Sequence, residues 1–154
     1  MVVRLNFPLL ALISIMLLTG GCSTTKTYKD ELTHNLEVNS KSDSVETTLD
    51  IYSVGSQCES EYRGTVALDG SSIELGIATE KSSYLVVGFA SSSFWSSSSG
   101  FISYDFTLFP RKTFHYEVDV FYIDNIYNVN VYEVSHLTGK KREMEATELR
   151  NCQS

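Results

Sequence analysis

The chain has 154 residues, with 12 Lys and Arg against 19 Asp and Glu, so its formal net charge is −7. This acidity argues against nucleic-acid binding, which depends on neutralising phosphates. Nine tyrosines, eight phenylalanines and only two prolines favour one β-rich domain over a disordered chain.

The first segment is apolar but short. Arg4 precedes the run FPLLALISIMLL, Phe7 to Leu18, in which Ser14 is the only polar residue. This run falls short of the roughly 20 apolar residues that a membrane-spanning helix needs. A positive start, a short apolar centre and an exit through small residues are typical of a secretory signal. We therefore predict that residues 1–21 are a signal peptide.

A cysteine follows the small residues Thr19, Gly20 and Gly21. The stretch from Arg4 to Cys22 resembles the lipobox of bacterial lipoproteins, although Thr19 stands where that motif most often has Leu. The resemblance implies that the Cys22 thiol receives a diacylglyceryl group and becomes the new N-terminus. It also implies, from Ser23 after the cysteine, sorting to the outer membrane. The alternative is an ordinary signal peptide cut near Gly21, which would leave Cys22 as a free thiol.

Loss of the signal peptide would make the chain more acidic. It removes Arg4 and no acidic residue, leaving 11 basic against 19 acidic side chains, or −8. A protein with this balance is weakly repelled by anionic lipid surfaces. We therefore expect the lipid, rather than surface charge, to hold it at the membrane.

The two remaining cysteines, Cys58 and Cys152, form an even set in an exported chain, which predicts one disulfide. Such a bond would link the C-terminus to the start of the folded region. The loop-entropy model gives it about 4–5 kcal/mol of stabilisation, as an upper figure. Two buried free thiols are the alternative.

The next segment is polar and mixed in charge. We predict that residues 22–46 are a lipidated N-terminus and a tether that lifts the domain off the membrane. Within it, Leu36-Glu37-Val38 has the pattern of a possible edge strand. The folded domain is then expected to span residues 47–154.

From there the sequence alternates between apolar and polar residues, which indicates half-buried strands. Asp69-Gly70 and Asp124-Asn125 are turn dipeptides between such runs. The predicted strands are Thr48–Val54, Gly64–Leu68, Ile73–Ile77, Tyr84–Ala90, Phe101–Phe109, Tyr116–Tyr122 and Tyr127–Val131. The segment from Thr138 to Leu149 is ambiguous between a short final strand and one helical turn.

About seven short strands without long helices predict an all-β fold, an antiparallel β-sandwich or small barrel. The general rhythm of the strands resembles the immunoglobulin-like or transthyretin-like domains of bacterial surface lipoproteins. No specific motif carries that second resemblance.

Motifs of catalysis are not visible. The chain has no GxSxG, HExxH, phosphate-loop or CxxC pattern, and its histidines, His34, His115 and His136, lie far apart in sequence. We therefore predict a protein that is not an enzyme, with no catalytic residues and no cofactor.

A weak metal pattern lies on one predicted strand. His115, Glu117 and Asp119 alternate, so they share one face and could approach a divalent cation. Their side chains would be roughly 6–7 Å apart, which is wide for a shared zinc ion. A solvated strand face is the favoured interpretation, and no metal site is predicted.

The stretch ASSSFWSSSSGF, Ala90 to Phe101, places Phe94 and Trp95 between serine runs that favour a loop. An exposed aromatic pair would be a contact surface for sugar rings, a protein partner or a bilayer. The alternative is that both rings fold back and plug one end of the sandwich.

These features together predict a lipid-anchored envelope protein of the outer membrane, with a structural or protein-interaction role. The alternative is a glycan or small-ligand binding module that uses Phe94 and Trp95. The expected partners are the membrane, through Cys22, and an envelope protein or glycan.

Overall fold

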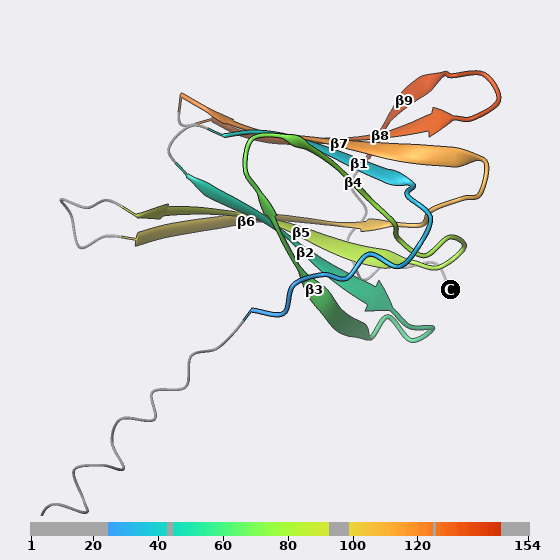
Figure 1. The fold of residues 1–154 in the computed structure, drawn as a ribbon, viewed down its shortest axis with the longest axis horizontal. Coiled ribbons are helices and arrows are strands. Elements are labelled where there is room, and N and C mark those ends of the chain that lie inside the picture. Colours follow the sequence, from blue (N-terminus) through green and yellow to red (C-terminus); the bar gives the residue numbers. More distant parts are fainter. Residues whose placement is uncertain (1–24, 43–44, 93–98, 125, 146–154) are drawn as a thin grey trace, which may run out of the picture.

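The computed structural model describes residues 25–42, 45–92, 99–124 and 126–145, and these residues form an all-β sandwich (Figure 1). The predicted fold class is confirmed. One sheet has the order β4 (Ser72–Leu75), β1 (Leu36–Ser42), β7 (Phe114–Ile123), β8 (Ile126–Ser135), β9 (Lys141–Met144). The other has the order β3 (Ser60–Leu68), β2 (Glu46–Val54), β5 (Ser83–Ser92), β6 (Ser99–Leu108).

The core lies between the two sheets, and the alternation in the sequence predicts its faces correctly. Tyr116, Val118 and Val120 on β7 are 0% exposed. They pack in one cluster with the inward residues of the other sheet, including Leu85 and Val87 of β5. Removing this apolar surface from water is the main favourable contribution to folding.

Strand β1 corrects the predicted domain boundary at residue 47. It pairs antiparallel with β4 and parallel with β7, so it lies inside the five-stranded sheet and not at an edge. Leu36 and Val38 are buried in the core, and Ser40 on the same face is buried as well. Part of the predicted tether is therefore an internal strand of the domain.

The strand count is nine among the described residues, against about seven predicted. The additions are β1 and the short strand β9, which follows the ambiguous Thr138 region and pairs with β8. The β1–β7 pair is parallel, whereas the other strand pairs among the described residues are antiparallel. The likeness to immunoglobulin-like or transthyretin-like domains stays a prediction.

Residues 25–35, which we call the strap, also belong to the domain. Thr27 forms a bridge with Thr65 of β3. The Tyr28 amide donates to the Thr65 carbonyl at 3.0 Å, and the Thr65 amide donates to the Lys26 carbonyl at 2.8 Å. In Figure 1 the strap runs past β3 and β2 before it enters β1. The predicted free tether is thus wrong for these residues.

The far end of the strap is fixed to the other sheet. The Asn35 amide donates to the Leu75 carbonyl at 3.0 Å, and the Asn35 side chain exchanges two hydrogen bonds of 2.9 Å with the backbone of Ile77. Asn35 is 9% exposed, so these bonds satisfy a buried amide. The strap therefore connects the edge of one sheet to the edge of the other.

Two glycines make room for the strap. A Cβ at Gly64 would lie 2.5 Å from the Tyr28 backbone, and one at Gly76 would lie 2.5 Å from the Leu32 carbonyl oxygen. Gly64 also has a φ of 151°, which side-chain-bearing residues rarely adopt. A larger residue at either position would push the strap off the sandwich.

Several predicted features lie outside the described residues: the signal segment, Cys22, Phe94, Trp95 and Cys152. Cys58 is described, between β2 and β3, and its sulfur is not a free thiol. Its pairing with Cys152 stays a prediction. Within the described ranges, no helix is long and apolar enough to cross a bilayer.

Candidate ligand-binding site

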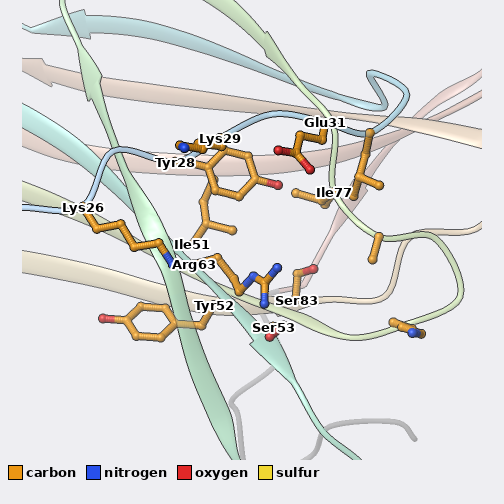
Figure 2. A pocket seen from close by; sticks show the side chains of 13 residues that line it. Lys26, Tyr28, Lys29, Glu31, Ile51, Tyr52, Ser53, Arg63, Ile77 and Ser83 are labelled. Carbon is orange, nitrogen blue, oxygen red and sulfur yellow. The ribbon is translucent and has the colours of Figure 1, made fainter.

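A cavity of about 490 Å³ opens beside the strap, and we call it the strap pocket (Figure 2). Its walls come from the strap, from β2 and β3, and from the connection between β4 and β5. Its lining residues are Lys26, Tyr28, Lys29, Glu31, Leu32, Ile51, Tyr52, Ser53, Arg63, Ile77, Ala78, Lys81 and Ser83. A volume of this size lies within the range of small-ligand sites.

The inner part of the strap pocket is apolar. Ile51 and Ile77, 2% and 3% exposed, come from opposite sides of the sandwich core. The half-buried ring of Tyr28 lies beside them, and Figure 2 shows its hydroxyl directed toward Ile77, whereas the ring of Tyr52 points away from Ile51 and contacts Tyr62 and Tyr84. This arrangement offers the apolar body of a ligand an apolar surface with one aromatic wall.

Tyr28 is held in place. Its hydroxyl donates to the Gly76 carbonyl at 2.6 Å. Burial raises the pKa of the Tyr28 phenol, and the nearby Asp30 carboxylate raises it further. The ring is therefore a neutral, fixed wall at physiological pH.

The rim of the strap pocket is strongly basic. Four cations line it, Lys26, Lys29, Arg63 and Lys81, against the single carboxylate of Glu31. Arg63 forms only a loose, exposed pair with Glu61, at 3.5 Å. The lining side chains thus include three more positive than negative charges, although Glu61 and Asp30 lie close by.

Three of these four cations have no counter-ion among the described residues. Of the ten Lys and Arg among the described residues, five form ion pairs: Arg63, Arg111, Lys112, Lys141 and Arg142. The other five are Lys26, Lys29, Lys41, Lys81 and Lys140. Three of these five unpaired lysines line the strap pocket. An anion entering the pocket would find ammonium groups that need not break an existing pair.

A second cavity, of about 270 Å³, brings all three histidines together. His34, His115 and His136 line it with Glu37 and Glu74. The rings of His115 and His136 have centroids 5.4 Å apart. These residues lie on different elements, and no sequence pattern indicates that they are close together in the fold. Among the residues with described positions, no three His, Cys, Asp or Glu form a group that could hold a metal ion.

The weak metal pattern on β7 is the polar face of a strand, with its carboxylates already engaged. Glu117 accepts from Lys141 at 2.6 Å and lies 3.4 Å from His115. Asp119 accepts from Asn39 at 3.1 Å. The Lys141 hydrogen bond is the main cause that lowers the pKa of Glu117. These contacts fit a structural ion pair better than a vacant cation site.

The strap pocket was not found by sequence reasoning. Its basic residues are separated by up to 55 positions (81 minus 26), and no motif links them. One available signal was Tyr28, a lone aromatic residue flanked by Lys26 and Lys29 inside an otherwise polar segment. An aromatic side chain in a supposed tether indicates that the segment packs on something.

Comparison of the chain with protein-family models, with curated proteins and with solved structures gives no significant match. The site is therefore interpreted from its own geometry and charge.

Proposed function

We propose that this protein is a lipid-anchored envelope protein that acts by binding, not by catalysis, and that the strap pocket receives an anionic ligand. The anchor is the proposed diacylglyceryl group on Cys22. The observation that carries the binding role is the gathering of three unpaired lysines around an apolar floor in an acidic protein. That combination favours a ligand with an anionic head and an apolar body.

The anchor is tested by metabolic labelling with an alkyne fatty acid. The natural chain should be labelled and should fractionate with membranes, whereas Cys22→Ser should do neither. Equal labelling of the two chains would contradict the anchor. The proposed Cys58–Cys152 disulfide is tested separately by non-reducing electrophoresis, in which the oxidised chain should migrate faster than the reduced chain.

The pocket is tested with octyl phosphate as the probe and neutral octyl glucoside as its comparison. Nuclear magnetic resonance should show shifts at Tyr28 and Gly76 with octyl phosphate and much smaller ones with octyl glucoside. The variant Lys26→Gln/Lys81→Gln should bind octyl phosphate more weakly. The matched control Lys41→Gln/Lys140→Gln removes the same charge from unpaired lysines elsewhere and should bind as the natural sequence does. Equal weakening in both variants would contradict a defined site.

A protein-interaction role has its own supporting observation at one end of the sandwich. Phe101 and Ile126 are each 67% exposed, on β6 and at the start of β8. Ile102, opposite the inward-facing Phe89 in the β5–β6 pair, is also exposed, on the other face of β6 from Phe101, and Phe89 contacts Tyr127 with ring centroids 5.2 Å apart. Exposed apolar side chains in one region are typical of contact surfaces.

The predicted loop with Phe94 and Trp95 connects the same two strands, β5 and β6. If those rings contact a partner, Phe94→Ala/Trp95→Ala should change the free energy of unfolding by no more than about 0.5 kcal/mol per site. If they plug the core, each change should cost about 3–5 kcal/mol. A melting curve separates the two, and a collapse in melting temperature would contradict the partner surface.

A further inference from the structure

We infer that the strap pocket binds the phosphate headgroup of an anionic phospholipid in the membrane that carries the protein's own anchor. The inference rests on the proposed function, because it uses both the lipid on Cys22 and the anion-binding role of the pocket. It adds the chemical class of the ligand, an anionic phospholipid, and the place where the protein binds it, the surface of the membrane.

The length of chain between the anchor and the pocket sets the first constraint. Lys26 lines the pocket and is four residues after Cys22. A chain extends by at most about 3.5 Å per residue, so Lys26 can be no more than about 14 Å from an acylated Cys22. Since the strap is hydrogen-bonded to β3 from Lys26 onward, the domain has no long tether with which to leave the surface.

Charge favours an anionic surface at this short range. The Debye length at physiological ionic strength is about 8 Å, so the near charges dominate over the distant ones. Lys26, Lys29 and Lys81 would face the headgroups without protein counter-ions among the described residues. Asp30 and Glu31 on the strap and Glu61 beside Arg63 offset part of this charge, so the expected attraction is local to the three unpaired lysines.

Two features of the pocket lining suit a phospholipid headgroup at a membrane surface. Ammonium groups at the rim match the phosphate of the headgroup. Tyr28 and Tyr52 are the amphipathic aromatic type that is enriched at membrane–water interfaces.

The test uses the processed chain from residue 22 with Cys22→Ser, so that no acyl chain contributes to binding. Co-sedimentation is measured with vesicles of phosphatidylcholine alone and with vesicles of equal parts phosphatidylcholine and phosphatidylglycerol. The chain should bind the second set and not the first. Since a lysine near an anionic surface contributes about fivefold in affinity, Lys26→Gln/Lys81→Gln should weaken binding about 25-fold. The control Lys41→Gln/Lys140→Gln should weaken it much less.

Each other outcome overturns the inference. Equal losses in the two variants would mean general surface attraction, without a role for the pocket. Binding of soluble glycerol 3-phosphate at the pocket, together with no binding to the anionic vesicles, would identify a free phosphate ester as the ligand. Both variants should melt at the same temperature as the natural sequence, because the substituted lysines are exposed and form no ion pair with described residues. A loss of binding then cannot be caused by unfolding.

Failure of the inference is distinguishable from failure of the proposed function. If Cys22 is labelled and octyl phosphate binds while anionic vesicles do not, only the lipid ligand is wrong. If octyl phosphate does not bind either, the pocket's proposed role is wrong as well. If Cys22 is not labelled, the anchor is wrong and so is the constraint on reach.

Discussion

At the scale of single residues, Glu31 is the one carboxylate that lines the strap pocket. It opposes the four cations, so its removal should make the pocket more positive and strengthen anion binding. Glu31→Gln should therefore bind octyl phosphate several-fold more tightly, as measured by titration. Glu143→Gln, an exposed change on β9 far from the pocket, is the control for net charge. Equal gains in both variants would place the effect outside the pocket.

Glu117 supplies a prediction about pH. The hydrogen bond from Lys141 lowers the pKa of Glu117 in the folded chain, so Glu117 stabilises the fold above its unfolded pKa. That contribution is lost as the pH falls through the lowered folded value. Lys141→Gln should thus cost about 0.5–1 kcal/mol near pH 7, because Lys141 is 43% exposed, and nothing once Glu117 is protonated.

Denaturant unfolding of Lys141→Gln between about pH 7 and pH 3 checks this, with Lys140→Gln as the control. Lys140 is the neighbouring residue and forms no ion pair with any described side chain. A stability difference that stays constant with pH would show that Lys141 acts through another contact, such as its position over the Tyr132 ring at 4.0 Å.

The sequence pattern predicts which side chains face the core. It does not predict which polar side chains from distant parts of the chain lie close together. Alternation correctly places Tyr116 inward and Glu117 outward, because the side-chain period of a strand is fixed by its geometry. The pocket lysines and the histidine cavity depend on long-range strand order. Nothing in the local sequence encodes the approach of Lys26 to Lys81 or of His34 to His115.

At the scale of elements, β1 is the strand that sequence reasoning placed wrongly. LEVNSKS has only two large apolar residues, and its third inward position is Ser40. A polar residue buried in an internal strand hides the alternation on which the prediction depends. The strong alternating runs of β2 and β7 predict strands correctly because every inward position in their centres is apolar or aromatic.

The internal position of β1 makes truncation a sharp test. A chain that begins at residue 47 lacks the strand between β4 and β7, along with the buried Leu36 and Val38. Each loss of such a side chain costs about 2–5 kcal/mol, and a domain has only about 5–15 kcal/mol in total. The truncated chain should not fold, as measured by circular dichroism and protease resistance.

A chain that begins at residue 25 is the matched control, because it keeps the strap and β1 while removing everything before the described residues. It should fold as the processed chain does. A cooperative melt of the shorter chain at a similar temperature would instead show that β1 is dispensable and that residues 22–46 act as a tether after all.

At the scale of the whole molecule, an acidic protein presents a basic opening next to its proposed anchor. Composition alone predicts repulsion from anionic lipid, since the mature chain would carry −8. The fold distributes the charges unevenly: the carboxylates of Glu37, Glu117 and Asp119 lie on the outer face of the five-stranded sheet, whereas Asp30 and Glu31 lie on the strap beside its lysines. The strap pocket lies at the other side, beside β2 and β3. Net charge is thus a poor guide to which surface meets the membrane.

The short link between anchor and strap predicts a fixed orientation. Nitroxide-headgroup lipids in neutral nanodiscs should broaden the resonances of the strap and of Arg63, while those of β9, at the far edge of the other sheet, should stay sharp. A Gly-Ser insertion of about 20 residues between Thr24 and Thr25 gives a link with a mean span of roughly 25 Å. The broadening of the strap should then largely disappear.

The same insertion after Ser154 is the control, because it leaves the anchor spacing unchanged and should leave the broadening as it was. In nanodiscs that contain phosphatidylglycerol, the lengthened link should keep part of the strap broadening, since the pocket itself still binds headgroups. Equal broadening of β9 and the strap in the natural chain would contradict a fixed orientation. If the chain with the lengthened link loses the strap broadening in anionic nanodiscs as well, the pocket does not bind headgroups. The short link alone would then bring the strap to the membrane.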